Sequence, residues 1–567
     1  MKLPIGISDF EELVTGNYDF ADKTLFIRDI VNDGAKIILI TRPRRFGKTL
    51  NLSMLFHFLQ SNRPSVPNLF GNLAIAEDHD FCSQHQNKYP VISISFKDIK
   101  KSSFAEAYPK IVHLISQLYQ EHRYLLDGDY LYSDEKELVT KFIRGIASQS
   151  DVEDSLALLA KYITKKWGKL PVILIDEYDT PIQESYLKGY YPEMMDFIRS
   201  ILGQVLKDNS NIKKAIIIGI TRVSQESLFS GVNNLEVYSL LREQFGKYFG
   251  FSEDEVNKLV NKAGYEKLLL SIKDWYKGYH IGKYLLYNPW SIINCLKNEG
   301  KLQPYWLNTS SNDIVVDLLT EADYSTKNQF ELLLQGHVIE KPILENLEFT
   351  ELKDKEEALW SLLLYAGYLN VTSNEIKGFQ LMAKISVPNK EVMYIYDGIV
   401  AGWFRKGTSL ESYKNFTDSL KAQDIDKFKQ HLSEFVAQNG SYFDFNKNSP
   451  EKIFHSFMLG LTVGLKDEYD VATYREPGKG NFDILFLPKV KQRYGIFYEQ
   501  KKGMVIGFRT SALLEKLTSK ARETLIKLDQ TSYLQMLNEH NVSKVLLLAA
   551  AFHGKNLVVS HEILHIR

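Results

Sequence analysis

The tripeptide Gly47-Lys48-Thr49 has the residue types that hold a nucleoside triphosphate. A glycine lets the backbone approach a phosphate, a lysine reaches the β- and γ-phosphates, and a threonine hydroxyl ligates Mg²⁺. The apolar run 37–41 before the tripeptide predicts a buried strand, and residues 50–59 after it predict a helix. A loop between a strand and a helix N-terminus binds phosphate through backbone N–H groups. The sequence therefore predicts a P-loop, with ATP and Mg²⁺ as its cofactors.

Arg42 stands where the usual motif Gly-x-x-x-x-Gly-Lys-Ser/Thr has its first glycine. Two interpretations stay open: the loop has another backbone shape, or it uses the side-chain charge of Arg44 and Arg45. We place the whole segment, from Arg42 through Phe46 to Thr49, at the nucleotide.

A pair of carboxylates, Asp176-Glu177, follows the apolar run 172–175. Sheets of the α/β class place ligands at the carboxyl ends of their strands. We expect Asp176 to hold the Mg²⁺ shell together with Thr49, and Glu177 to polarise the attacking water. The alternative is that the pair caps a helix N-terminus. Lys48 and Glu177 are thus the candidate catalytic residues of this site.

Thr221 and Arg222 follow another apolar run, 215–220. Thr221 could sense the γ-phosphate, and Arg222 could stabilise charge in cis or on a neighbouring copy, which would require a homo-oligomer. A solvated loop pair explains the same two residues equally well.

The C-terminal part has a second set of chemically capable residues: Asp483, Glu499 and Lys501. Strand side chains alternate, so Glu499 and Lys501 at the end of the run 494–500 would share a face, with Asp483 on the hairpin partner. Metal-dependent nucleases need converging carboxylates and a basic group. Exposed strands often carry such charges, so the pattern alone is weak.

The elements that must position these residues point to the α/β class. Short apolar runs separated by amphipathic stretches predict a parallel sheet that is buried on both faces. These runs are 36–41, 91–96, 172–175 and 215–220. From residue 252 the pattern turns helical and aromatic. We interpret Tyr276, Tyr279, Tyr287 and Trp290 as packing in a helical lid rather than as a base-stacking platform.

The second half predicts smaller units. A helix over 356–369 and strands near 379–382 and 392–395 suggest a winged-helix-like module. The polar, helical segment 409–438 makes a linker. Beyond it we expect a further α/β unit, with helices over 452–465 and 511–528, strands over 482–487 and 494–500, and a final strand over 544–551.

Length and composition fit this division. A chain of 567 residues is too long for one hydrophobic core. Two cysteines without ligand spacing argue against a disulfide framework or a zinc site and favour a reducing compartment. The absence of a signal-peptide pattern and of apolar runs of about 20 residues predicts a cytoplasmic protein without a membrane span.

The formal net charge is -1, but residues 447–567 hold 18 Lys and Arg against 12 Asp and Glu. This basic excess is compatible with nucleic acid as a partner. Ordinary surface solubility explains it as well.

A set of segments carries a resemblance to a known family. They are Asp22-Lys-Thr-Leu-Phe-Ile-Arg28, Arg42-Pro-Arg-Arg-Phe-Gly-Lys-Thr49, Leu174-Ile-Asp-Glu-Tyr-Asp179, Ser230-Gly-Val-Asn-Asn234, Trp275-Tyr-Lys-Gly-Tyr279, Tyr287-Asn-Pro-Trp290, Tyr305-Trp-Leu-Asn-Thr309 and Gly480-Asn-Phe-Asp483. They resemble those of the bacterial and archaeal AAA-ATPase-like family with a C-terminal PD-(D/E)XK nuclease-superfamily domain. In that family Arg-Pro-Arg-Arg-Phe-Gly-Lys-Ser/Thr is the P-loop itself, which implies that Arg42 is a family feature.

The resemblance also implies roles in the C-terminal part. Asp483 and Glu499 become metal ligands and Lys501 the catalytic lysine, with Glu451 and Glu476 as accessory acids. The expected parts are a P-loop ATPase core (1–250), a helical lid (251–345), a winged-helix-like module (346–408), a helical linker (409–445) and a restriction-endonuclease-like α/β domain (446–567).

Two functions follow. One is an ATPase that couples nucleotide state to a Mg²⁺-dependent nuclease acting on nucleic acid, DNA rather than RNA. The other is an ATP-dependent switch or scaffold whose C-terminal domain binds nucleic acid or protein without cutting. The intact set Asp483, Glu499 and Lys501 favours the first.

Overall fold

The chain folds into two compact units, Met1–Met393 and Tyr394–Arg567, which we describe separately. The computed structural model describes residues 1–61, 68–223, 228–229, 232, 234–308, 313–334, 336–396, 410–439, 465, 468–476, 481–489, 503–511, 513–529, 537, 542, 544–553 and 556–565.

The first unit is built on a parallel sheet whose strand order is β2-β3-β4-β1-β5. Its strands are β1 (Ile37–Thr41), β2 (Val91–Ser95), β3 (Val172–Asp176), β4 (Lys214–Gly219) and β5 (Leu235–Tyr238). Every neighbouring pair is parallel. The four predicted strands are confirmed, whereas β5 was missed because its four residues include Glu236 and form no continuous apolar run. The order brings the carboxyl ends of β1, β4 and β3 together at one edge.

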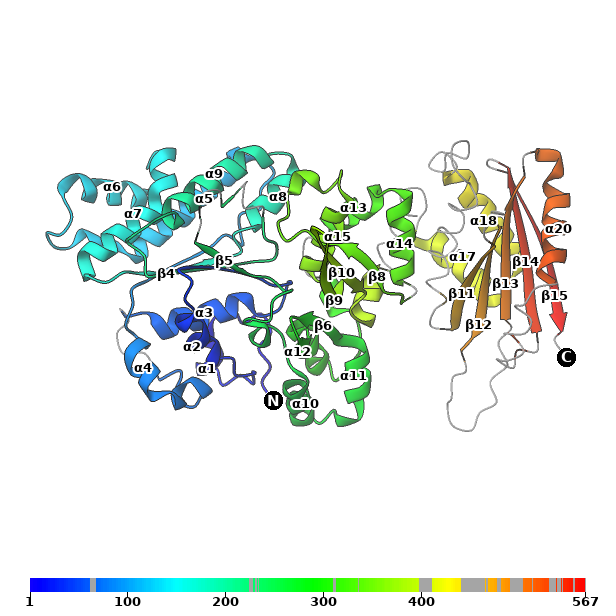
Figure 1. Ribbon diagram of the computed structural model, residues 1–567. Coiled ribbons are helices and arrows are strands. Elements are labelled where there is room, and N and C mark those ends of the chain that lie inside the picture. The colour runs from blue at the N-terminus through cyan, green and yellow to red at the C-terminus, as the bar shows by residue number, and fades with distance from the viewer. Residues whose placement is uncertain are drawn as a thin grey trace. The chain divides into compact units, whose positions relative to one another are not determined.

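Helices cover both faces of this sheet. Figure 1 shows α5, α7 and α9 on one face and α1, α2 and α3 on the other. Their bounds are α1 (Phe10–Thr15), α2 (Leu25–Asn32), α3 (Lys48–Leu59), α5 (Phe104–Glu121), α7 (Gln149–Trp167) and α9 (Tyr191–Leu206). Local capping sets their ends: α7 begins with a capping box between Ser148 and Asp151 and ends at Gly168 in the left-handed region.

The region predicted as a helical lid contains a β-hairpin. It has helices α10 (Glu253–Ala263), α11 (Leu269–Tyr276) and α12 (Pro289–Lys297), with strands β6 (Lys277–Ile281) and β7 (Tyr284–Tyr287) between α11 and α12. The hairpin needs a glycine at 278, where φ is +142° and a Cβ would lie 1.9 Å from the Pro388 carbonyl oxygen. Tyr276, Tyr279 and Tyr287 are buried, as the packing interpretation predicts.

The middle part of the first unit has a three-stranded sheet in the order β8-β10-β9. Its elements are β8 (Ile339–Pro342), α15 (Glu356–Ala366), β9 (Asn370–Lys377) and β10 (Gln380–Ser386). The boundary that we expected between residues 345 and 346 separates β8 from the strand with which it pairs, β10.

The helix and one strand of this part agree with the expectation, but the strand predicted at 392–395 is wrong. Residues 390–396 are helical, and the partner of β10 is β9. Val392, Ile395 and Tyr396 are buried, which is the i, i+3, i+4 spacing of a helix face.

The second unit is a mixed sheet in the order β11-β12-β13-β14-β15. Its strands are β11 (Tyr469–Glu476), β12 (Asn481–Pro488), β13 (Gly503–Thr510), β14 (Lys544–His553) and β15 (Asn556–His565), and its helices are α17 (Leu410–Ala422), α18 (Ile425–Asn439) and α20 (Leu517–Asp529). Among the described strands of this unit, only β13 and β14 pair in parallel. The strand expected to be final, β14, is followed by β15.

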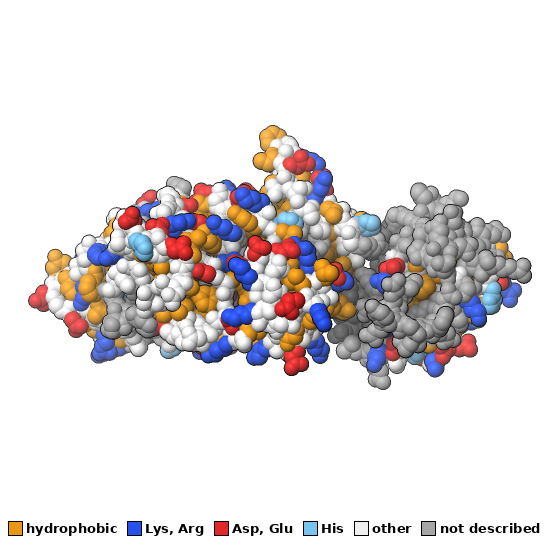
Figure 2. Space-filling model, turned by 90° about the horizontal axis from the view of Figure 1, so that it is seen from below, with side chains coloured by type: hydrophobic (Ala, Val, Ile, Leu, Met, Phe, Trp, Pro, Cys, Tyr) orange, Lys and Arg blue, Asp and Glu red, His pale blue; other side chains and the backbone are white. Residues whose placement is uncertain are grey.

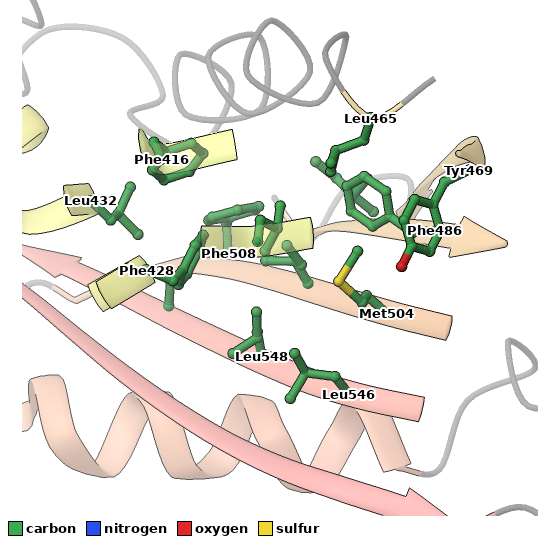
Figure 3. Packing of buried hydrophobic residues seen from close by; sticks show 14 of the residues in the cluster. Phe416, Phe428, Leu432, Leu465, Tyr469, Phe486, Met504, Phe508, Leu546 and Leu548 are labelled. Atoms are coloured by element: carbon green, nitrogen blue, oxygen red, sulfur yellow. The ribbon is translucent and has the colours of Figure 1, made fainter. Parts of the chain in front are cut away.

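The segment predicted as a linker is helical but does not serve as a linker. Phe416 and Leu420 of α17 and Phe428 and Leu432 of α18 are at most 3% exposed and belong to the hydrophobic core on the sheet. Figure 3 shows Phe416, Phe428 and Leu432 in one cluster with Phe508 and Leu548. Polar composition concealed an apolar face that only the packing reveals.

The register around Asp483 differs from the predicted hairpin. Asp483 lies opposite Tyr474 of β11 and Gly507 of β13, so the neighbouring strand is 503–510 rather than 494–500. Glu499, Lys501 and Glu451 lie outside the described residues, as does the predicted helix 452–465 except for its last residue. The predicted set of Asp483, Glu499 and Lys501 therefore stays a prediction.

Among the described residues, no helix is long and apolar enough to cross a bilayer. Figure 2 shows positive and negative side chains intermixed over the described surface of the first unit on the face in view.

Candidate nucleotide site

The loop between β1 and α3 has the backbone shape that cradles an anion. Gly47 has φ of 80° and Arg45 has φ of 67°, both in the left-handed region, and the chain enters α3 at Lys48. A Cβ built on Gly47 would meet no atom within 4 Å, so this part of the backbone faces open space. The loop thus leaves backbone N–H groups available at a helix N-terminus.

Arg42 has a different place from the nucleotide-contacting one that we predicted. Its side chain is fully buried, and its guanidinium donates to the carbonyls of Thr41 (2.8 Å), Tyr238 (2.7 Å) and Gln244 (3.0 Å). Burial lowers the pKa of Arg42 to about 9. Arg42 is not among the residues that line the cavity; it ties the start of the loop to β5 and the segment after it.

Lys48 is buried at the first turn of α3, with 6% of its surface exposed. Its Nζ donates to the loop carbonyls of Arg42 (3.2 Å) and Pro43 (3.0 Å). Burial lowers its pKa, and the carboxylates of Glu177, Asp179 and Asp176 act in the opposite direction. The ammonium therefore lies inside the loop, with acidic neighbours at the adjoining strand ends.

Thr49 and Asp176 meet across the edge of the sheet. The Thr49 hydroxyl donates to Asp176 Oδ2 at 2.8 Å, while Asp176 Oδ1 is buried and has no hydrogen-bond partner among the described residues. Burial raises the pKa of Asp176 to about 6. An unpaired carboxylate oxygen beside a hydroxyl suits a hard cation that prefers oxygen ligands, so these residues fit Mg²⁺.

Glu177 follows β3 with φ of 50°, a left-handed conformation that a glutamate adopts at some cost. It lines the same cavity as Lys48 and Thr49. Its Oε2 accepts a hydrogen bond from the Thr180 hydroxyl at 3.2 Å. The strained turn brings the Glu177 carboxylate to the cavity that Lys48 and Thr49 also line.

Thr221 does not reach the cavity, which corrects its expected role as a phosphate sensor. It is fully buried, and its hydroxyl donates to Asp179 Oδ2 at 3.0 Å. The same oxygen accepts the N–H groups of Ile220 (3.0 Å) and Thr221 (2.9 Å). Asp179, which the sequence analysis did not single out, thus joins the ends of β3 and β4.

Arg222 is not among the residues that line the cavity either. Its carbonyl accepts the N–H of Leu347 at 2.9 Å, and Val223 bridges to Leu347, so this segment joins the middle part of the unit. The described contacts do not place Arg222 where an arginine finger in cis would act.

The cavity has a volume of about 470 Å³, within the ~300–1,000 Å³ of small-molecule sites. Its lining combines basic and polar residues with apolar and aromatic ones. The first group includes Arg44, Arg45, Gly47, Lys48, Thr49, Lys97 and Glu177; the second includes Ile7, Phe20, Phe251, Pro289, Trp290 and Ile293.

Trp290 is a site residue that the sequence analysis assigned to packing. It lines the cavity, and the Arg45 guanidinium lies 4.2 Å from the centroid of its ring. Its position directly after Asn288-Pro289, at a helix start, was the available signal. Phe46 also lines the cavity, although it is only 1% exposed, and its ring packs edge-on against Tyr279 at 5.0 Å, which anchors the loop.

The N-terminal part of the chain is similar to a known family. Residues 4–229 match the model of the AAA-ATPase-like family, described as predicted AAA-ATPase. A protein described as "Uncharacterized protein in vnfD 5'region", from Azotobacter chroococcum mcd 1, is 26% identical over 483 residues, covering 82% of this chain and 84% of that protein. The Walker-type ATPase PABY2304 of Pyrococcus abyssi matches with 13% identity and a TM-score of 0.37, covering 66% of this chain and 96% of that one.

The parallel sheet, the loop before α3 and the family match define the N-terminal region as an ATPase-like domain.

Proposed function

We propose that the first unit binds ATP with Mg²⁺ and hydrolyses it. The observation that carries the proposal is the convergence of Lys48, the Thr49–Asp176 pair and Glu177 on one cavity. They come from a loop and from the neighbouring ends of strands far apart in the sequence.

We place the phosphates against the basic residues of the cavity lining. Lys48 donates to two carbonyls of its own loop, and phosphate oxygens would replace these acceptors and strengthen the contact through their charge. Thr49 and Asp176 would hold Mg²⁺, which supplies charge neutralisation of the β- and γ-phosphates. Arg44 and Arg45 line the same cavity and add positive charge to that of Lys48.

We place the base and the ribose against the apolar residues of the cavity lining. Trp290, an aromatic residue, lines the cavity, as do Phe251 and Pro289. Flat apolar surfaces of this kind stack on a purine. The cavity thus matches a ligand with a polyanionic end and an aromatic end.

Glu177 is the group that would act on water. It is a carboxylate on a left-handed turn at the phosphate end, and it would orient and polarise a water for attack on the γ-phosphate. The products would be ADP and inorganic phosphate.

The test is ATP binding by calorimetry with the full chain. Lys48→Ala should bind about 100-fold more weakly, from the loss of roughly 3 kcal/mol of charge-assisted contact. Lys36→Ala is the matched control, because Lys36 donates to the Asn209 carbonyl and lies just before the opposite end of β1. Unchanged affinity in Lys48→Ala would overturn the proposal.

For the second unit we propose a Mg²⁺-dependent nuclease that acts on nucleic acid, DNA rather than RNA, under control of the ATPase. Its support is Asp483 on β12, an interior strand of an α/β sheet, together with the basic excess of residues 447–567. The alternative is a unit that binds nucleic acid or protein without cutting.

Incubation with Mg²⁺ and DNA or RNA, with and without ATP, separates these two functions. Cleavage by the wild type that is lost in Asp483→Ala supports the nuclease. Cleavage that persists in Asp483→Ala rules out the assignment, and binding without cleavage supports the alternative.

A further inference from the structure

Glu391 is a fully buried carboxylate that the proposed chemistry does not use. Its Oε2 accepts the hydroxyl hydrogen of Ser291 at 2.7 Å, and its Oε1 accepts the N–H of Trp306 at 2.9 Å. Ser291 lies on α12, and Trp306 lies on the short helix η5 (Tyr305–Asn308). One side chain therefore holds two separate elements to the helix that begins at residue 390.

Both elements also position Pro289 and Trp290, two of the apolar residues of the nucleotide cavity. Pro289 and Trp290, which line it, directly precede Ser291. The indole N–H of Trp290 donates to the carbonyl of Tyr305 at 3.1 Å, and Tyr305 is the residue before Trp306. The position of the Trp290 ring thus depends on two segments that Glu391 joins.

The start of α12 is tied to the phosphate-binding loop as well. Asn288 caps the helix by accepting the N–H of Trp290 at 2.9 Å, and its amide donates to the carbonyl of Arg44 at 3.4 Å. The P-loop side of α12 is therefore held by Asn288, and its far side by Glu391.

A buried carboxylate costs free energy unless its interactions offset the lost hydration. In the described part of the chain, the hydrogen-bond partners of Glu391 are a hydroxyl and backbone amides, with no Lys or Arg among them. Burial raises the pKa of Glu391 to about 7. A leucine would fill such a place without this cost, so the two directed hydrogen bonds are what the carboxylate contributes.

We propose that Glu391 is a positioning residue of the nucleotide site, which fixes Pro289 and Trp290 at the base end of the cavity without touching the ligand. This inference rests on the proposed ATP binding. Its specific consequence is selectivity: loss of the Glu391 contacts weakens binding of the base and leaves binding of the phosphates intact.

The test compares two ligands, a non-hydrolysable ATP analogue and inorganic tripolyphosphate, each with Mg²⁺, by calorimetry on the full chain. Glu391→Ala should weaken the ATP analogue about 10-fold, as expected for the loss of one or two buried hydrogen bonds, and leave tripolyphosphate within about twofold. Glu391→Gln, which keeps the shape and one acceptor, should restore most of the affinity at pH 6.

Two control variants make the result specific. Lys48→Ala should lose both ligands, because it removes the phosphate contact. Glu135→Ala removes another buried carboxylate of the same unit, one that pairs with Lys165 and does not line the cavity, and it should change neither ligand.

The pH dependence of ATP-analogue binding tests the same contacts. The variant is Glu391→Gln, because this substitution changes the side-chain volume little. The charged carboxylate accepts stronger hydrogen bonds than the neutral acid, so wild type should bind the ATP analogue about threefold more tightly than Glu391→Gln at pH 8 and equally at pH 6. Tyr276, Tyr279, Cys295 and Tyr305 face Glu391, and burial raises the pKa of each of them, so they stay protonated over this range.

Equal weakening of both ligands in Glu391→Ala would show a general structural role and overturn the inference, as would no change in either. If Glu391→Ala does not fold, a constant ratio between wild type and Glu391→Gln from pH 6 to pH 8 overturns it. A wild type that binds neither ligand would instead reject the proposed ATP site itself.

Discussion

The sheets of the two units place their polar residues by different rules. In the five-stranded sheet of the first unit every neighbouring pair is parallel, so the carboxyl ends of its strands meet at one edge, and the residues after β1 and β3 become neighbours. In the second unit most pairs are antiparallel, and the register decides which residues face each other. A parallel sheet therefore makes a site easier to predict from strand ends than an antiparallel hairpin does.

The largest expected effect tests the edge of the first sheet. Glu177→Gln should reduce ATP hydrolysis by about 100-fold or more, because an amide cannot take up a proton from water, while ATP affinity stays near the wild-type value. Steady-state phosphate release and calorimetry measure the two quantities. If Glu177→Gln hydrolysed ATP at the wild-type rate, Glu177 would not be the catalytic carboxylate. The meeting of residues at the edge of the sheet would then not identify the catalytic group.

The next effect tests the second unit, whose core includes the predicted linker. Phe428→Ala should lower its free energy of unfolding by about 3–4 kcal/mol, since it removes a ring that is 1% exposed. Denaturant-induced unfolding, with the transition of each unit followed separately, measures this free energy. Gln430→Ala, an exposed position on the same helix, is the control and should change stability by less than about 0.5 kcal/mol.

A smaller effect concerns the electrostatics of the first edge. Burial raises the pKa of Asp176 to about 6 from an ordinary value near 3.8. The folded state thus binds more protons than the unfolded state between these values, and the contribution of Asp176 to stability falls as pH rises from about 4 to 6. Asp176→Asn should flatten the melting-temperature profile over this window. An unchanged slope would contradict the burial of this carboxylate.

The site residues show how far sequence patterns reached. Lys48, Thr49, Asp176 and Glu177 line or adjoin one cavity, because each follows a strand whose apolar run is a local signal. Arg42 and Thr221 lie at equally prominent strand ends, but they do not line the cavity, and their side chains bond to backbone carbonyls and to Asp179 instead. Nothing local distinguishes a strand end that faces the cavity from one that faces a neighbouring element.

The sequence alone determined the strand-loop-helix unit around Gly47, the buried strand before Asp176, and the α/β class, since these depend on residues adjacent in the chain. Tertiary structure decided that Arg42 bonds to the carbonyls of Tyr238 and Gln244. It also decided that Trp290 lines the cavity and that Gly507 lies opposite Asp483. Each of these outcomes depends on contacts between distant segments, where packing and register, rather than local composition, set the direction of a side chain or the neighbour of a strand.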